Sequence, residues 1–386
     1  MQKIKSKIKH SPLLGKLYLM TMGLVLKIMQ LFIPIDNKKI IFSSFSGRQL
    51  SDSPYVIYQQ FLQDPDFKDY DMVWAFVEPQ NFPKIPPECK VKIDTFSFWK
   101  QLLESKFWVS NSSIERLIPT IHGKHIYINT WHGIPLKHLG PDEGNLEFLV
   151  KNWFKTVNFD LLYCSGKYDQ KIFKHIFPNT QNIQVLGLPR NLELTHQFSE
   201  TKREKMFHNL NLSLEKETIL YAPTFREYSD VNGLNEFALP FSNRFINEIT
   251  KDFNVLVRGH YFVESLDVEN ASQRKIINVS DYSNLNDLFQ ISDIVISDYS
   301  SLIFDYSLLN KRIVLYLNDI EEYEKYRGFY LNPKHLDLPK AYNEDELIEK
   351  IYSSNDEKAV KTLNIKFNEY FDSNSQYLKK FIINKS

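Results

Sequence analysis

The sequence of 386 residues contains little cysteine and no excess charge of either sign. Its two cysteines, Cys89 and Cys164, exclude a disulfide framework and a cysteine-rich metal site, and they are typical of a reducing compartment. Lys+Arg and Asp+Glu both number 47, so the formal net charge is zero and binding to long duplex nucleic acid is disfavoured. Only 12 Gly and 17 Pro stand beside 43% hydrophobic residues, which excludes collagen-like, coiled-coil and disordered classes.

Two common nucleotide-binding signatures are also missing. Neither GxxxxGK(S/T) nor a well-placed GxGxxG occurs, so an ATPase or an ordinary dinucleotide-binding enzyme lacks support. His122 and His125 lie three residues apart without a nearby acidic partner, and we interpret them as surface or structural residues. The sequence therefore predicts no metal site.

A long apolar run lies near the N-terminus, from Leu13 to Ile33, after a basic stretch. As a helix it would reach about 31 Å, roughly the thickness of a bilayer core. Lys16 and Lys27 interrupt the run within about 20° of one another, which predicts an interfacial helix rather than a span. The basic residues before it would attract anionic lipid, so we expect peripheral attachment to the cytoplasmic face of a membrane. The alternative is a core helix with snorkelling lysines.

Short apolar segments rich in Val, Ile, Phe and Tyr recur through the rest of the chain and predict strands. They are Ile40–Ser44, Met72–Val77, Val91–Asp94, Phe107–Ser110, His125–Ile128, Leu161–Cys164, Ile183–Leu186, Thr218–Ala222, Asn254–Val257, Ile276–Val279, Asp293–Ser297 and Arg312–Leu317. Helical patterns fall between many of them, at Pro54–Leu62, Tyr168–Phe177, Phe241–Thr250, Leu285–Ile291 and Ser301–Leu309.

This alternation predicts an α/β protein with parallel sheets covered on both faces. The pattern appears twice, with a polar stretch at Glu200–Glu217 between, so two Rossmann-like domains facing each other are expected. The expected parts are a membrane-associating segment at 1–35, an N-terminal domain at 36–195, a C-terminal domain at 196–345, and helices at 346–386 that pack back.

Ligands of such sheets bind beyond the carboxyl ends of the strands, and four of these places carry reactive groups. The first is Asn129–Lys137, where His132 is able to take up a proton near neutral pH. Gly133 lets backbone N–H groups approach a ligand closely, and Lys137 is a candidate phosphate contact. The alternative for His132 is a capping residue in a structural turn.

The second place is Tyr221–Arg226, where Pro223 and Thr224 offer a shaped turn and a hydroxyl group and Arg226 a guanidinium. Arg226 could equally pair with a surface acid. The third is Arg258–Tyr261, which again places a cation, a glycine and a histidine after a strand. A buried structural histidine is the alternative there, although a strand-end histidine in each half favours a shared function.

The fourth place is Ile296–Asp305, where a strand ends, Ser300 and Ser301 follow, and a helix begins. Unpaired N–H groups, the helix dipole and the two hydroxyls predict an anion site. Asp305 lies one turn deeper on the same side and could accept hydrogen bonds from a hydroxyl-bearing ligand. The alternative is a serine N-cap with nothing bound.

Together these residues resemble the bacterial CDP-glycerol glycerophosphotransferases of teichoic acid synthesis. The similar segments are TWHGIPLKHLG at 130–140, YAPTFR at 221–226, RGHY at 258–261, SDYSSLIFD at 297–305 and GLPRN at 187–191, with weaker matches in SGRQLSDSPYVIY at 46–58 and RGFY at 327–330. The resemblance spans about residues 38–335, with the motifs in family order.

The resemblance implies a glycosyltransferase-B-like fold with a cleft between an acceptor-side domain and a CDP-alcohol-binding domain. It implies transfer of glycerol phosphate from CDP-glycerol to a hydroxyl of a polyprenyl-linked saccharide or polymer, with release of CMP and no further cofactor. His132 would be the general base, and His260 with Arg258 would hold the pyrophosphate. The other residues that the resemblance places around the substrates are Trp131, Gly133, Ile134, Pro135, Leu136, Arg190, Pro223, Thr224, Gly259, Ser300, Ser301 and Asp305.

The chain departs from the family pattern at several positions. Ile134 stands where many relatives have threonine, Phe225 where many have tryptophan, Gly259 where many have a larger residue, and Leu192 where an acid is common. The donor could therefore carry ribitol or another polyol, and both primases and polymerases occur among the short members. Two other hypotheses are a nucleotide-sugar glycosyltransferase of the same architecture in capsule synthesis, and a non-catalytic partner in a surface-polymer assembly complex.

Overall fold

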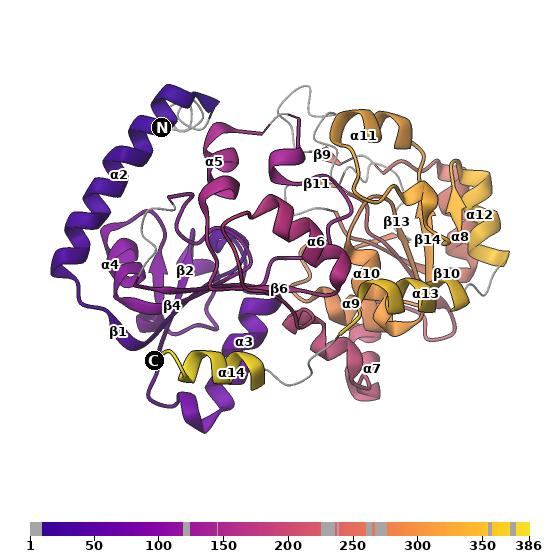
Figure 1. The fold of residues 1–386 in the computed structure, drawn as a ribbon. Coiled ribbons are helices and arrows are strands. Elements are labelled where there is room, and N and C mark those ends of the chain that lie inside the picture. Colours follow the sequence, from indigo (N-terminus) through magenta and orange to yellow (C-terminus); the bar gives the residue numbers. More distant parts are fainter. Residues whose placement is uncertain are drawn as a thin grey trace. The chain divides into compact units, whose positions relative to one another are not determined.

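The computed structural model describes residues 10–118, 124–144, 146–224, 236–237, 239–259, 265–266, 276–353, 357–370 and 376–386 (Figure 1). The chain divides into two compact units. The first consists of Met1–Ile134, Leu139–Leu192 and Glu369–Ser386, and the second of Pro135–His138 and Glu193–Asn368.

The first helix, α2, spans Pro12–Phe32. The Ser11 side chain caps it by accepting a hydrogen bond from the Leu14 N–H, and Pro34 follows its end. Gly15, Gly23 and Leu26 are buried on the inner face. The outer face is apolar and exposed, so the alternative of a core helix is not supported. Its most exposed side chains are Leu13 (77%), Met20 (72%), Leu31 (80%) and Phe32 (80%).

The first unit is built on a seven-stranded parallel sheet in the order β3-β2-β1-β4-β5-β6-β7. Its strands are buried on both faces, which is why they read as continuous apolar runs in the sequence. The strands are β1 Asp36–Ser43, β2 Asp71–Phe76, β3 Lys90–Lys92, β4 Ser105–Ser110, β5 Ile126–Asn129, β6 Leu161–Cys164 and β7 Ile183–Val185.

Helices cover this sheet and close its aromatic core. They are α3 Asp52–Gln63, α4 Phe96–Glu104, α5 Phe148–Thr156, α6 Lys167–Ile176 and α14 Gln376–Ile383. The C-terminal helix α14, yellow in Figure 1, lies beside α3 and inserts Leu378 and Ile382 into the same core as Phe42 and Trp74. The last helix of the chain therefore completes the hydrophobic core of the first unit.

The second unit is built on a six-stranded parallel sheet in the order β12-β10-β8-β13-β14-β15. A separate pair joins β9 Glu236–Phe237 to β11 Ser265–Leu266. The strands of the main sheet are β8 Glu217–Tyr221, β10 Phe253–Val257, β12 Ile276–Asn278, β13 Ile294–Ser297, β14 Arg312–Tyr316 and β15 Lys340–Ala341.

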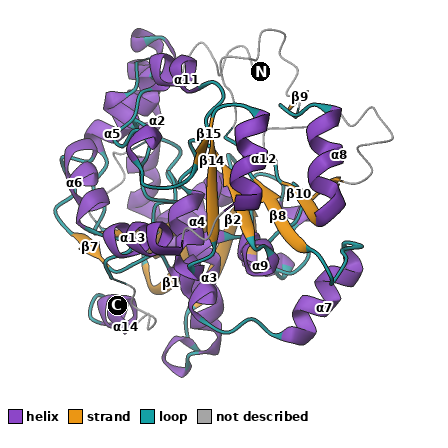
Figure 2. Cartoon of the chain, turned by 90° about the vertical axis from the view of Figure 1, so that its right-hand side faces the viewer, coloured by secondary structure: helices purple, strands orange, loops and turns teal. Residues whose placement is uncertain are grey.

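Helices also cover the second sheet, and Figure 2 shows α8 and α12 in front of its strands. The helices are α7 Glu200–Asn209, α8 Asn243–Asp252, α9 Leu285–Ile291, α10 Leu302–Tyr306, α11 Ile320–Arg327, α12 Glu344–Ser353 and α13 Glu357–Phe367. The polar stretch expected between the halves contains α7, which belongs to the second unit and is joined to α9 by the ion pair Lys202–Asp287.

The predicted α/β class with two Rossmann-like domains is confirmed. Every strand segment predicted from the sequence overlaps an observed strand. The strand order reverses between β1 and β4 in the first sheet and between β8 and β13 in the second. Open parallel sheets bind ligands at such switch points. The loops that follow these four strands are therefore the expected ligand-binding loops.

Candidate functional site

The carboxyl edge of the first sheet is lined by polar residues in register. Ser43 of β1 pairs with Ser110 of β4, and Ser110 pairs with Asn129 of β5. The loops that follow these strands are joined across the switch point, because the Phe45 N–H donates to Oδ1 of Asn111 at 2.8 Å. This edge is therefore a connected polar frame rather than a set of independent loops.

His132 lies in the loop after β5, and its ring is held by a hydrogen bond and by contacts with two aromatic rings. Its Nδ1 is 2.7 Å from the backbone carbonyl of Asn111. The ring stacks on Trp131, with centroids 4.5 Å apart, and the Phe45 ring lies 5.8 Å away. Because a carbonyl only accepts hydrogen bonds, Nδ1 carries the proton of the neutral imidazole and the lone pair is on Nε2. This tautomer is the one that a general base acting through Nε2 needs.

The backbone around His132 is in an unusual conformation. Trp131 has a φ of 52° and Gly133 a φ of 145°, and left-handed geometry is costly for a residue such as tryptophan. Oδ1 of Asn129 accepts a hydrogen bond from the Trp131 N–H at 2.8 Å and holds the turn. Strain of this kind is typical of functional loops, where the surrounding contacts enforce it.

Arg190 lies in the turn Pro189–Thr195 and contacts the same loop. Its Nη1 donates to the backbone carbonyl of His132 at 2.9 Å and to Oδ2 of Asp52 at 2.6 Å. The structure thus brings the predicted residues His132 and Arg190 together within the first unit. Asp52 belongs to the weaker motif at 46–58, which had suggested no role for it.

The chain passes from the first unit to the second directly after Ile134. Ile134 and Leu136 are almost fully buried, and the peptide Pro135–His138 belongs to the second unit. There the Leu136 carbonyl accepts from the N–H groups of Tyr330 and Leu331.

Lys137, a candidate phosphate contact, pairs with Phe329 in an antiparallel bridge. Its ammonium group lies 5.9 Å from the centre of the Tyr323 ring, a cation–π contact.

At the switch point of the second sheet, Asp298 ties two loops together. Both of its carboxylate oxygens accept from the Thr224 N–H, at 2.9 and 3.1 Å, and Oδ1 also accepts from the Tyr299 N–H. The Ser297 hydroxyl donates to the Ala222 carbonyl at 2.8 Å. Pro223 and Thr224 are buried in the resulting turn. Phe225 and Arg226 lie outside the described residues.

Arg258 follows β10 and is held by backbone carbonyls. Its Nη1 donates to the carbonyls of Val279 and Tyr282, at 3.2 and 2.6 Å. Burial lowers the pKa of its guanidinium, and the nearby Asp281 carboxylate opposes that shift. The Gly259 N–H donates to the Ser280 hydroxyl at 2.9 Å. His260 and Tyr261 lie outside the described residues.

The predicted anion site after β13 differs in detail from expectation. The helix predicted over 301–309 is a short α-helix, Leu302–Tyr306, followed by a 3₁₀ turn at Ser307–Leu309, and Asn310 ends it in a left-handed conformation. The Ser300 hydroxyl accepts from the Leu302 N–H at 3.4 Å, whereas the Ser301 side chain makes no capping bond. Asp305 is 4% exposed.

Among the described residues, no group of three or more His, Cys, Asp and Glu side chains is arranged to hold a metal ion. His125 is a buried structural residue, with Nδ1 2.7 Å from the Ser105 carbonyl and its ring stacked on Trp108. His122 lies outside the described residues.

Three residues that organise the two edges escaped the sequence analysis. Asn111 sets the tautomer of His132, Asp52 holds Arg190, and Asp298 holds the Thr224 turn. Each acts on a backbone or side chain far away in the sequence. The available signal was their position: Asn111 and Asp298 directly follow a predicted strand, and Asp52 lies within the weaker motif at 46–58.

Comparison with known sequences identifies one family. The sequence profile described as "CDP-Glycerol:Poly(glycerophosphate) glycerophosphotransferase" matches residues 25–384. A teichoic acid poly(glycerol phosphate) polymerase of Staphylococcus epidermidis is 32% identical over 77% of this chain, which spans only 43% of that protein. A protein of the same description from Bacillus spizizenii is 30% identical over 92% of both chains.

The fold is also similar to that of a solved structure. A histidine-to-asparagine variant of the wall teichoic acid polymerase TagF, soaked with CDPG, has a TM-score of 0.77 and 28% sequence identity. The alignment covers 91% of this chain and 89% of the chain in that structure. Because about a tenth of this chain lies outside the alignment, the likeness extends over both units.

Proposed function

The chain belongs to the CDP-glycerol:poly(glycerophosphate) glycerophosphotransferase family, and we propose that it transfers glycerol phosphate from CDP-glycerol to a hydroxyl group of a lipid-linked acceptor. The product would extend a teichoic acid or a related surface polymer, and CMP would be released. The single observation that carries this proposal is the 2.7 Å contact between Nδ1 of His132 and the Asn111 carbonyl, which leaves Nε2 as the basic nitrogen.

The reaction assigned to His132 is general base catalysis. The acceptor hydroxyl gives its proton to Nε2 while its oxygen bonds to the phosphorus that carries glycerol. The bond between that phosphorus and the bridging oxygen breaks, and the oxygen leaves with CMP. Such a transfer requires mainly positioning and stabilisation of charge, which fixed donors supply at low cost in reorganisation.

The remaining roles follow the family motifs. Arg258, whose guanidinium is oriented by two carbonyls, and His260 would stabilise the charge that develops on the pyrophosphate. Arg190 would support the loop of His132. The residues proposed to line the donor and acceptor are Trp131, Gly133, Ile134, Pro135, Leu136, Pro223, Thr224, Gly259, Ser300, Ser301 and Asp305.

The helix α2 suggests where the reaction takes place. We propose that its exposed apolar face lies in the interfacial region of the membrane, at the cytoplasmic surface. By length and composition the helix could also cross a bilayer. However, it packs against α4 and α5 of the first unit, which supports a helix lying along the surface. An acceptor anchored on a polyprenyl lipid would be presented to the enzyme there.

The test is a donor screen with the full chain. CDP-glycerol, CDP-ribitol and a UDP-sugar are each incubated with a synthetic lipid-linked disaccharide, and nucleotide release and product mass are measured. We expect turnover of CDP-glycerol, and His132→Ala should lower it at least ~100-fold. His175→Ala is the matched control, because His175 is an exposed histidine on α6 of the same unit.

Each other outcome has a definite meaning. Turnover of CDP-ribitol alone would replace the glycerol donor by ribitol, and turnover of the UDP-sugar alone would indicate a glycosyltransferase. Near-normal CMP release by His132→Ala would remove the general base assignment. Absence of turnover with every donor would support a non-catalytic partner and refute the proposal.

A further inference from the structure

Asp52 stands at the end of the loop that follows β1, as the first residue of α3. Its φ of 64° is left-handed, a conformation that Asp and Asn adopt more readily than most residues. The side chain is only 6% exposed. Oδ1 accepts from the Ser53 N–H at 2.6 Å, and Oδ2 accepts from Nη1 of Arg190 at 2.6 Å. Both oxygens of the carboxylate therefore have fixed directions.

The first turn of α3 holds Arg190 at two points. The Ser53 hydroxyl accepts from the Arg190 N–H at 3.2 Å, and Asp52 pairs with the guanidinium. The same Nη1 donates to the His132 carbonyl at 2.9 Å. A carboxylate on one loop is thus connected, through one guanidinium, to the main chain of the proposed general base.

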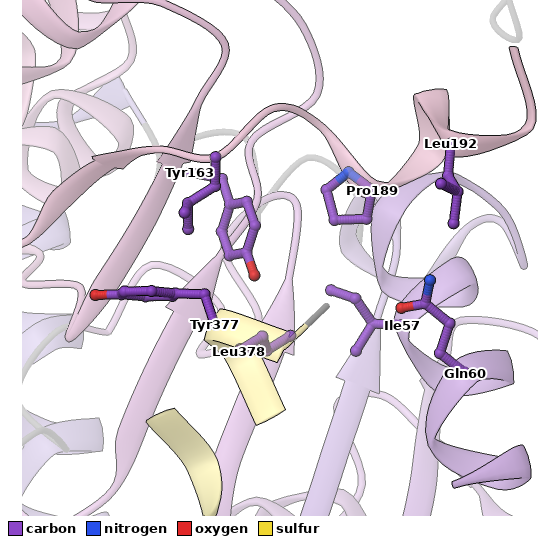
Figure 3. Close-up of a pocket in the computed structure, with 8 residues that line it drawn as sticks. Ile57, Gln60, Tyr163, Pro189, Leu192, Tyr377 and Leu378 are labelled. Carbon is purple, nitrogen blue, oxygen red and sulfur yellow. The ribbon is translucent and has the colours of Figure 1, made fainter. Parts of the chain in front are cut away.

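The packing beneath the Arg190 turn is incomplete. Pro189 and Leu192, which flank Arg190 and Asn191, line a cavity of about 20 Å³. Both are labelled among its lining residues in Figure 3. The other side chains that line it include Ile57 and Gln60 of α3 and Tyr163 of β6. The buried side chains of Leu188 and Leu194 anchor the turn on either side of Arg190. Asp52 and Ser53 add the polar contacts that join Arg190 itself to α3.

The loop of His132 needs such support. Trp131 is left-handed and Gly133 has a φ of 145°, so the loop keeps its shape only because surrounding contacts enforce it. Two of these contacts are the hydrogen bond from Nδ1 to the Asn111 carbonyl, which orients the ring, and the hydrogen bond from Arg190 to the carbonyl of His132. Loss of either contact would weaken the restraint on the imidazole.

We propose that Asp52 is a positioning residue for the transfer reaction and that it acts on His132 through Arg190. The inference rests on the proposed function, because it assigns a role within the same site. The role is indirect, because the carboxylate of Asp52 accepts hydrogen bonds from Ser53 and Arg190. Its carboxylate holds the guanidinium of Arg190 in place, and the guanidinium holds the backbone carbonyl of His132.

The test compares turnover by the full chain with Asp52 replaced. Asp52→Asn keeps the volume of the side chain and suits the left-handed backbone, but it removes the charge. We expect kcat with CDP-glycerol to fall about 10- to 100-fold, because a displacement of about 1 Å is enough for such a loss, while KM for CDP-glycerol changes little. Asp52→Glu, which restores the charge, should recover part of the lost kcat.

The path through Arg190 is tested by a double-mutant cycle. If Asp52 acts through Arg190, the variant Asp52→Asn/Arg190→Lys should be no slower than Arg190→Lys alone. The matched control is Asp64→Asn at the other end of α3, where a carboxylate pairs with Lys379 at 2.7 Å. It should keep the wild-type kcat.

A second measurement makes the outcome independent of turnover. Nitrogen NMR of labelled histidine reports the environment of both ring nitrogens of His132, identified by comparison with His132→Ala. We expect Asp52→Asn and Arg190→Lys to change these signals alike and Asp64→Asn to leave them unchanged. Unchanged His132 signals in Asp52→Asn, an unchanged kcat, or multiplicative losses in the double variant would overturn the inference. A wild-type chain inactive with every donor would instead refute the proposed function, and the NMR comparison would still decide the role of Asp52.

Discussion

Replacement of His125 should change how the stability of this protein depends on pH. His125 precedes β5, is 3% exposed and stacks on Trp108. Its Nδ1 donates to the Ser105 carbonyl. Burial lowers the pKa of the imidazole to about 4, since the protonated form would lose its hydration. The folded state therefore favours the neutral imidazole of His125, whereas in the unfolded chain this histidine has its ordinary pKa.

The magnitude follows from linkage. Because the pKa is lowered in the folded state, the unfolded state binds more protons as pH falls below its own pKa, and stability is lost between about pH 6.5 and 4. With those two pKa values, the contribution to the loss between pH 7.5 and 4.5 is about 2.5 kcal/mol. Above about pH 7.5 both states are neutral and the contribution vanishes.

The measurement is urea unfolding of wild type and His125→Asn at pH 7.5 and at pH 4.5. Asparagine keeps an N–H donor for the Ser105 carbonyl but does not titrate. On acidification, the free energy of unfolding of the wild type should fall by about 2.5 kcal/mol more than that of the variant. Equal losses in the two proteins would show that His125 is not held neutral, and would refute the reasoning from burial.

Two further predictions concern α2 and the second unit. Replacement of Leu31 and Phe32 by Glu should weaken binding to vesicles of anionic lipid at least about tenfold, because each apolar side chain gains about 1.5–3 kcal/mol on burial. Co-sedimentation checks this, and unchanged binding would exclude α2 as the membrane contact. Asp298→Ala should destabilise the fold by about 2–5 kcal/mol, because it removes the acceptor of the buried Thr224 and Tyr299 N–H groups. Denaturant unfolding measures this, and a loss below about 1 kcal/mol would mean that both groups find other acceptors.

The sheets could be predicted from the sequence because parallel strands buried on both faces are continuous apolar runs. The helix α2 could also be predicted, because Ser11 and Pro12 mark its start and Pro34 follows its end. The two-residue strand β15 was missed, since a strand that short has no periodicity of its own. The helix α7 was missed as well, because most of its residues are polar and only Met206 and Phe207 are buried, which gives no apolar periodicity.

The motifs predicted which loops carry chemistry, but not how those loops are held. His132 was found because a histidine after a strand has an obvious reactive group. Asn111 was not, since its effect depends on β4 lying between β1 and β5, which places its carbonyl beside a residue 21 positions away. Asp52 looked like an ordinary acid at a helix start, and its partner Arg190 lies 138 residues further along. Long-range pairs of this kind become visible only once the strand order is known.

Each unit is assembled from separate segments of the chain, which affects how the protein folds during synthesis. The backbone passes between the two units at 134/135, 138/139, 192/193 and 368/369, and α14 supplies Leu378 and Ile382 to the first core. On the ribosome, the strands of the first unit emerge before α14, so the core of this unit stays incomplete until α14 has been synthesised. A tag, stop codon or protease cut near the C-terminus would therefore damage the part of the enzyme that was synthesised earliest.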